Sequence, residues 1–190
     1  DSEESWYQDT IDQMIYELME RYNQEKTIVF NTYQMYRCKM LERLIAAHAK
    51  SLEKGYYLGA KLVRGAYMEK ERERAAIRGY EDPILPTKKA TDEQYNEALK
   101  FCIENIERIE VCSGSHNERS NHYLMELMEI HGIHPSDKRI FFAQLYGMSD
   151  HISFNLAFAN YNVVKYLPYG PVKAVLPYLF RRAEENTSIT

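Results

Sequence analysis

Two cations stand on one short segment that otherwise has the apolar character of a buried strand. Residues 61–67 read KLVRGAY, in which Lys61 and Arg64 flank two apolar residues. Gly65 and Ala66 then leave open space before Tyr67. Lys and Arg bind anions, and small residues let a ligand approach the backbone closely. The segment therefore predicts a flat, anionic ligand at the point where this strand ends.

A second basic motif lies near the end of the chain, in YLFRRAEEN at 178–186. On a helix, the adjacent Arg181 and Arg182 point about 100° apart and cannot share one solvated face. Tyr178 and Glu185 lie three or four residues from this pair, so they share its side of the helix. The planar guanidinium matches a carboxylate. The motif suits either a carboxylate-binding pair or a salt-bridge cluster within the helix.

Polar residues also gather at the carboxyl end of every predicted strand, where parallel sheets and barrels bind their ligands. Asn117 equally suits the N-cap of the helix that begins near Glu118, a role that does not exclude ligand contact. In chain order these residues are Asn31 and Gln34; Lys61, Arg64 and Tyr67; Ser115, His116 and Asn117; Gln144, Tyr146 and Gly147; and Lys165, Tyr166 and Tyr169.

The elements that position these residues alternate along the chain. Thr91, with Gln94 three residues later, has the pattern of a capping box. The strands are short apolar runs, typical of a parallel sheet covered on both faces. Strands are predicted at 27–34, 57–67, 108–117, 139–148 and 162–170, and helices at 4–22, 40–52, 67–78, 91–108, 118–131, 150–160 and 171–185.

Two α/β architectures fit this rhythm, an open doubly wound sheet and a (β/α)8 barrel. A dinucleotide-binding open sheet would normally show a G-x-G-x-x-G turn, which the sequence lacks. A barrel needs eight strands. We therefore expect a TIM-like barrel whose first two strands and the start of the third are absent, with residues 1–190 as one domain and Asp1 ending the third strand.

Composition narrows the class of protein. The net charge of −4 over 190 residues argues against a nucleic-acid binder. There is no run of about 20 apolar residues. Cys38, Cys102 and Cys112 lack the spacing of metal ligands, which predicts reduced, buried thiols and no metal site. The first residues include no initiator Met and no signal peptide, so we expect a fragment whose targeting segment lies elsewhere.

Several motifs together resemble one known family, proline dehydrogenase, and the resemblance covers essentially the whole chain. GYEDPI at 79–84 is similar to the monofunctional type rather than to the domain of the bifunctional bacterial enzyme. The other motifs, in order, are KLVRGAYMEKE at 61–71, SHN at 115–117, QLYGM at 144–148, KYLPYGP at 165–171 and PYLFRRAEEN at 177–186.

The resemblance implies a (β/α)8 barrel that holds FAD and performs the first step of proline catabolism. L-Proline would be oxidised to Δ1-pyrroline-5-carboxylate by hydride transfer from C5 to flavin N5. Ubiquinone or menaquinone would then take the electrons. The implied location is either the bacterial cytoplasm at the inner membrane face or the mitochondrial inner membrane and matrix, with peripheral membrane contact. The proline amine must be neutral to react, so the rate should fall at low pH.

The resemblance also implies roles for individual residues. Arg181 and Arg182 would clamp the proline carboxylate, Lys61 and Arg64 would stabilise the reduced flavin, and Asp1 would be an acid beside the pocket. Tyr166, Tyr178 and Leu145 would surround the pyrrolidine ring. The flavin-lining positions are Asn31, Lys61, Val63, Arg64, Gly65, Ala66, Tyr67, His116, Asn117, Gln144 and Glu185. Bacterial bifunctional members carry Arg in place of Lys61, Gln in place of Asn31 and Trp in place of Met68.

The sequence leaves two alternatives open. One is hydroxyproline dehydrogenase, a sister activity on the same scaffold. Tyr166 occupies a position where the hydroxyproline type tends to have a smaller residue, which favours proline. The other is a non-catalytic fragment of the enzyme that relies on the rest of the polypeptide to complete the barrel.

Overall fold

The computed structural model describes residues 4–187, except for the side chains of residue 174 and of residues 181–187. Each predicted strand and helix is present, although the strands are shorter than expected. The strands are β1 (Asn31–Gln34), β2 (Leu58–Val63), β3 (Ile109–Gly114), β4 (Ile140–Leu145) and β5 (Val163–Tyr166), and the helices are α1 (Ser5–Tyr22), α2 (Met40–Lys54), α3 (Met68–Arg78), α4 (Lys88–Glu104), α5 (Glu118–Ile130), α6 (Asp150–Phe158) and α7 (Val172–Thr187).

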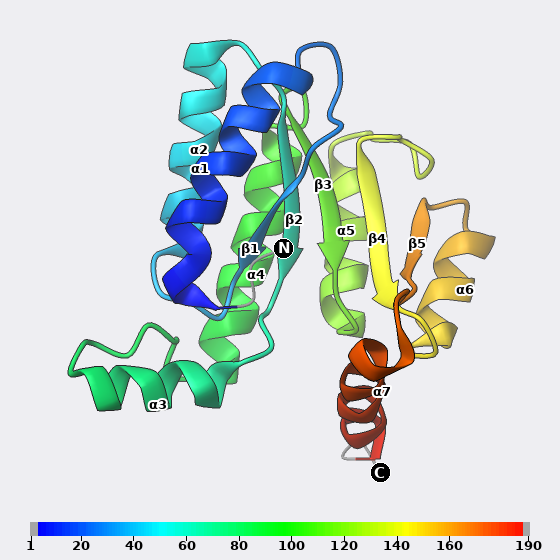
Figure 1. Ribbon diagram of the computed structural model, residues 1–190. Coiled ribbons are helices and arrows are strands. Elements are labelled where there is room, and N and C mark those ends of the chain that lie inside the picture. The colour runs from blue at the N-terminus through cyan, green and yellow to red at the C-terminus, as the bar shows by residue number, and fades with distance from the viewer. Residues whose placement is uncertain (1–3, 188–190) are drawn as a thin grey trace.

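The described strands form one parallel sheet in the order β1-β2-β3-β4-β5, so each strand pairs with the next one along the chain. Because strand–helix–strand connections are right-handed, a sheet that always grows in one direction keeps its connecting helices on one face. In Figure 1, α4 and α5 lie behind the strands, while α3 and α7 lie beneath their carboxyl ends. This order is that of a (β/α)8 barrel segment, as predicted, and not of a doubly wound sheet.

The two faces of the sheet differ in how deeply their side chains are buried. Ala60, Leu62 and Val111 are fully buried and pack with Tyr95 and Leu99 of α4 in the main core. Along β3 and β4, buried residues alternate with half-buried ones. One face of these two strands is therefore buried against the helices, whereas their second face is only half-buried. Their second face, which we call the inner face, points towards the side that a closed barrel encloses.

Of the two predicted helix starts, the one of α5 is confirmed and the one of α4 is wrong. Asn117 caps α5 by accepting a hydrogen bond from the Ser120 amide at 3.1 Å, as predicted. The predicted capping box at Thr91 is wrong, because α4 begins earlier, with Thr87 as its N-cap. The Gln94 amide instead donates to the carbonyl oxygens of Met35 and Arg37, both at 2.8 Å. A tertiary contact therefore replaces the predicted local one.

The cysteines follow their prediction only in part. Cys102 is buried and Cys112 partly so, but Cys38 is exposed, contrary to the prediction. Among residues 4–187, none of the helices combines the length and apolar character needed to cross a membrane. The same part of the chain contains no cluster of three or more His, Cys, Asp or Glu side chains suited to a metal ion.

Candidate functional site

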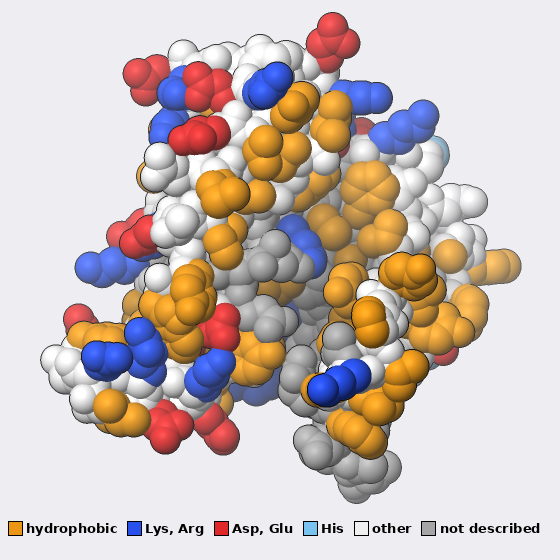
Figure 2. All heavy atoms as spheres, viewed as in Figure 1, with side chains coloured by type: hydrophobic (Ala, Val, Ile, Leu, Met, Phe, Trp, Pro, Cys, Tyr) orange, Lys and Arg blue, Asp and Glu red, His pale blue; other side chains and the backbone are white. Residues whose placement is uncertain are grey.

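The inner face collects residues that the sequence placed around the substrate or flavin. Since side chains alternate along a strand, Lys61 and Val63 point away from the buried Leu62 and onto this face. Leu145 of β4 lies opposite Tyr166 of β5 in the parallel register, so both also project there. Figure 2 shows this side of the molecule, hollowed between α3 on the left and α7 on the right.

Two tyrosines form an aromatic corner at the edge of this hollow. The rings of Tyr166 and Tyr178 have centroids 6.0 Å apart and planes tilted by 54°. The Lys61 ammonium nitrogen lies 5.9 Å from the centroid of the Tyr166 ring. A cation at this distance is attracted to the face of the ring. Strands β2 and β5 and helix α7 thus contribute one side chain each to a single cluster, which we call the lysine–tyrosine cluster.

Small residues line the wall between these strands. Gly114 of β3 pairs in register with Ala143 of β4. A Cβ atom at Gly114 would lie 3.0 Å from a methyl carbon of Val63, so a larger residue would crowd the face. Ala143 pairs in turn with Val164 of β5. This row of small side chains leaves room for a flat group beside Lys61.

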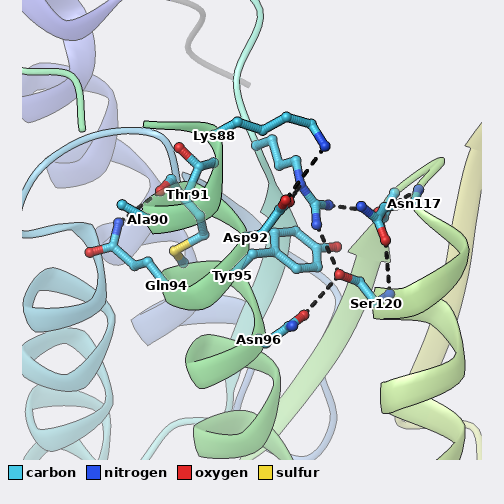
Figure 3. A network of polar contacts seen from close by, with 12 residues as sticks. Lys88, Ala90, Thr91, Asp92, Gln94, Tyr95, Asn96, Asn117 and Ser120 are labelled. Carbon is cyan, nitrogen blue, oxygen red and sulfur yellow. Dashed lines mark hydrogen bonds and ion pairs between the residues drawn. The ribbon is translucent and has the colours of Figure 1, made fainter. Parts of the chain in front are cut away.

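Arg64 takes the opposite direction from Lys61 and enters a polar network between α4 and α5. Figure 3 shows this network around Asp92, Asn96, Asn117 and Ser120. The Nε of Arg64 donates to Asp92 at 2.7 Å, and its two terminal nitrogens donate to the hydroxyls of Ser115 and Ser120, both at 2.8 Å. The guanidinium carbon lies 4.3 Å from the centroid of the Tyr95 ring. Lys61 and Arg64 therefore point to different regions, whereas the sequence predicted that both would face the flavin.

A wide pocket of about 1160 Å³ opens beside this network. It lies at the first turns of α4, α5 and α6, where backbone N–H groups have no helical partner and favour anions. We call it the outer pocket. Its lining residues are Lys88, Lys89, Asp92, Glu93, Asn96, His116, Asn117, Glu118, Arg119, Ser120, Gly147, Met148, Ser149 and His151.

His116 and Asn117 line the outer pocket. Gln144 does not line it but contacts the loop that carries them. His116 Nδ1 is 2.9 Å from the Ser149 hydroxyl, which links the starts of α5 and α6. Gln144 is buried, donates to the Ser115 carbonyl oxygen at 3.3 Å and accepts from the Ser153 hydroxyl at 2.9 Å. These bonds hold Ser115, and with it the loop that carries His116, against β4.

Asn31 points away from both the inner face and the outer pocket, because its amide donates to Asp12 of α1 at 2.8 Å. Thr32 and Gln34 are the residues of β1 that share the inner face, paired in register with Lys61 and Val63. The sequence placed both Asn31 and Gln34 among the polar strand-end residues, but only Asn31 among the flavin-lining positions. Strand alternation is the signal that separates them, since Asn31 has the parity of the core residue Tyr33 and Gln34 does not.

Gly65 is required for a reason other than ligand space. Its φ of +121° is unfavourable for other residues, and a Cβ atom there would lie 2.3 Å from the Tyr36 ring. Ala66 and Tyr67 follow in the turn that leads to α3. Asp1 and the side chains of Arg181, Arg182 and Glu185 lie outside the described residues, although the backbone of α7 carries the last three.

Burial controls the ionisation of the groups beside these sites. Burial raises the pKa of Tyr95 to about 12, and the pKa of Tyr36 rises to about 12 for the same main reason. Both phenols therefore stay neutral well into the alkaline range. Burial also raises the pKa of the Cys112 thiol, an effect that the nearby Lys61 opposes.

Comparison with known proteins places this geometry in a family. The model of the family described as proline dehydrogenase matches residues 1–190. Human proline dehydrogenase 1, mitochondrial, is 44% identical over the whole chain, and a bovine hydroxyproline dehydrogenase is 42% identical over 85% of it. These matches cover 32% and 36% of the two relatives, so the chain spans about a third of their length.

Solved structures agree on the fold. Proline utilization A (PutA) from Bdellovibrio bacteriovorus, inactivated by N-propargylglycine, superposes with a TM-score of 0.89 at 27% identity, covering 97% of this chain and 19% of that one. PutA from Corynebacterium freiburgense superposes with a TM-score of 0.71 at 22% identity. The α/β class of the (β/α)8 barrel type, predicted from the rhythm of the sequence, is confirmed. The motifs, the sheet order and the family match agree, and the chain belongs to the proline dehydrogenase family.

Proposed function

We propose that residues 1–190 form part of the single catalytic domain of an FAD-dependent proline dehydrogenase, which oxidises L-proline to Δ1-pyrroline-5-carboxylate. The observation that carries this proposal is the lysine–tyrosine cluster at the carboxyl ends of the strands, next to the helix that carries Arg181 and Arg182. Aromatic walls suit an apolar ring, and paired arginines suit its carboxylate.

FAD fits the two regions that the structure separates. A dinucleotide has a flat ring system at one end and a pyrophosphate and adenosine towards the other. The row of small residues beside Lys61 suits the flat ring, and the outer pocket, with three helix N-termini and Lys88, Lys89 and Arg119, suits the anionic part. When bound, FAD would supply the hydride acceptor that the side chains of the protein lack.

The residues of the chain would act by binding and orienting the substrate. Arg181 and Arg182 would hold the carboxylate of proline, and Tyr166 and Tyr178 would flank its ring and exclude water. Lys61 would place a positive charge where negative charge develops during the reaction. The amine of proline must be deprotonated to react, so the rate should fall as the pH is lowered.

The partners and location are inferred from the same family. Electrons would pass to ubiquinone or menaquinone at a membrane that the protein touches peripherally. Of the two locations that the sequence left open, the mitochondrial one is supported, because the human and fly relatives carry that word in their names. The bacterial alternative has no such support. Reduction of a short-chain quinone by proline and enzyme, with and without membranes, tests this part of the proposal.

The decisive experiment uses the protein expressed from its complete coding sequence. Purified protein should absorb at about 450 nm, as bound flavin does, and proline should bleach this band. The variants Arg181→Met and Arg182→Met should raise KM for proline about 30-fold or more while FAD stays bound, because each removes one of the two charged partners of the carboxylate. Lys173→Met removes an exposed cation from the same helix and serves as the control.

Two outcomes would count against the proposal. Colourless protein that cannot be reconstituted with FAD would favour the non-catalytic alternative. Unchanged proline kinetics in both arginine variants would remove the carboxylate clamp, even if the protein is yellow and active.

Hydroxyproline dehydrogenase is the second candidate, because bovine and Xenopus laevis relatives with that name are 42% and 40% identical to the chain. A hydroxyl on the pyrrolidine ring needs space, and the Tyr166 ring, which lies against Tyr178, would reduce that space if it flanks the substrate as proposed. We therefore expect faster turnover with proline than with trans-4-hydroxy-L-proline. The reverse order of rates would select the second candidate.

A further inference from the structure

One carboxylate in the outer pocket opposes the binding of an anion. Among the described lining residues, Glu93 and Glu118 have side chains that are 65% and 73% exposed, and they pair with Lys89 and His151. The side chain of Asp92 is only 28% exposed. A partly buried negative charge in a pocket built from helix N-termini would repel a phosphate unless it is neutralised.

Arg64 supplies that neutralisation from behind the pocket. It contacts Asp92 through Nε at 2.7 Å, whereas Lys88 reaches the other carboxylate oxygen only at 3.5 Å and is largely exposed. Arg64 itself is absent from the described residues that line the outer pocket. It therefore touches the lining residues rather than the space between them.

The position of Arg64 is set by several rigid partners. Three of its nitrogens are engaged, by Asp92 of α4, by Ser115 after β3 and by Ser120 of α5. Its guanidinium carbon lies over the ring of Tyr95, a fully buried residue. The Ser120 hydroxyl extends the network by donating to Asn96 of α4 at 2.8 Å. Arg64 thus joins the first turns of α4 and α5, which form two sides of the pocket.

We propose that Arg64 is a positioning residue, which neutralises Asp92 and holds the starts of α4 and α5 so that the outer pocket accepts the anionic part of a dinucleotide. The inference rests on the proposed function and deepens it, since it assigns Arg64 an indirect role in place of flavin contact. The inference predicts that removing Arg64 weakens FAD binding because the charge of Asp92 is left unpaired. It does not predict the loss of a direct contact between Arg64 and the ligand.

A double-mutant cycle on the complete protein separates the two roles. FAD affinity of the apoprotein is measured by quenching of flavin fluorescence. Arg64→Met should weaken binding by about tenfold or more, because Asp92 is then left unpaired beside the anion. Asp92→Asn alone should change affinity by less than about threefold, and Arg64→Met/Asp92→Asn should recover at least about fivefold over Arg64→Met.

The controls distinguish a local charge effect from a general one. Glu97→Gln and Lys100→Met each remove an exposed charge of α4 that does not line the outer pocket, and should leave affinity nearly unchanged. Arg64→Lys keeps the charge but not the fork, and is the fallback if Arg64→Met does not fold. It should bind FAD within about threefold of the wild type.

The results that overturn the inference are specific. A double variant no better than Arg64→Met, or a loss of about tenfold or more in Arg64→Lys, would show that the contacts of Arg64 matter and the charge of Asp92 does not. Wild-type protein that takes up no FAD would instead defeat the proposed function, and this inference with it. Thermal unfolding of each apoprotein shows whether a variant is folded before its affinity is read.

Discussion

At the scale of single residues, the two cations of KLVRGAY, Lys61 and Arg64, lie in different regions of the structure. Lys61 lies on the inner face near the Tyr166 ring, whereas Arg64 lies between α4 and α5 and is bound to Asp92. The separation follows from strand geometry, because residues an odd number of positions apart point to opposite faces. The two charges therefore serve two regions, the hollow at the inner face and the outer pocket.

Lys61→Met should affect turnover more than substrate binding. If the ammonium stabilises charge that develops in the reaction, kcat should fall by about tenfold or more, with a smaller change in KM. The rate at which proline bleaches the flavin band in a single turnover measures this directly. Lys100→Met removes an exposed lysine of α4 and is the matched control. Equal kcat in both variants would exclude the proposed role of Lys61.

At the scale of elements, α3 and the start of α1 both lie near the carboxyl ends of the strands (Figure 1), and side-chain contacts join them. The Ser5 amide donates to Glu71 Oε1 at 2.6 Å, across 66 residues of sequence, and Glu71 is fully buried. Arg74 of α3 lies over the Trp6 ring, with its guanidinium carbon 4.1 Å from the centroid. These contacts fix where α1 begins relative to the hollow at the inner face.

Glu71→Ala should release the start of α1. The loss of a buried, charge-assisted bond should cost about 1–3 kcal/mol of unfolding free energy and speed hydrogen exchange in the first turn of α1. Glu71→Gln keeps an oxygen acceptor and should lose less. Glu69→Ala, on the exposed side of the same helix, controls for helix propensity. Exchange that is equally slow in Glu71→Ala and Glu69→Ala would contradict this role of Glu71.

At the scale of the whole molecule, the sheet forms one wall of a barrel, with β1 and β5 at its edges. Large exposed apolar side chains gather towards the β5 edge, on the right of Figure 2, and include Phe154, Phe158, Leu167 and Tyr169. A closed barrel has no free strand edge. We therefore expect activity only where further strands pair with β1 and β5 and close the barrel.

Stability in acid is also a property of the whole molecule, and Asp137 contributes to it. Its carboxylate accepts from Arg139 Nε at 3.0 Å and from Nη2 at 2.8 Å, and these bonds lower its pKa. A depressed pKa in the folded state adds stability at neutral pH. That stability is lost as the pH falls below the ordinary value of about 4 and through the folded value.

Asp137→Asn should therefore be less stable than the wild type at pH 7, and the difference should shrink as the pH falls below about 4. Urea unfolding at a series of pH values measures the gap. Asp150→Asn, whose side chain is 55% exposed in its pair with Lys165, should show a smaller gap. A gap for Asp137→Asn that is independent of pH would point to packing rather than charge.

The sequence by itself determined the alternation of strands and helices, the cap at Asn117 and the family. These depend on local periodicity, on single side chains next to their own backbone, and on motif order. The tertiary structure decided which strand-end residues meet. It turned Asn31 towards Asp12, drew Gln94 to Met35, and set Tyr36 against Gly65. Such contacts join residues far apart in the chain, and only the packing of the folded sheet and helices determines them.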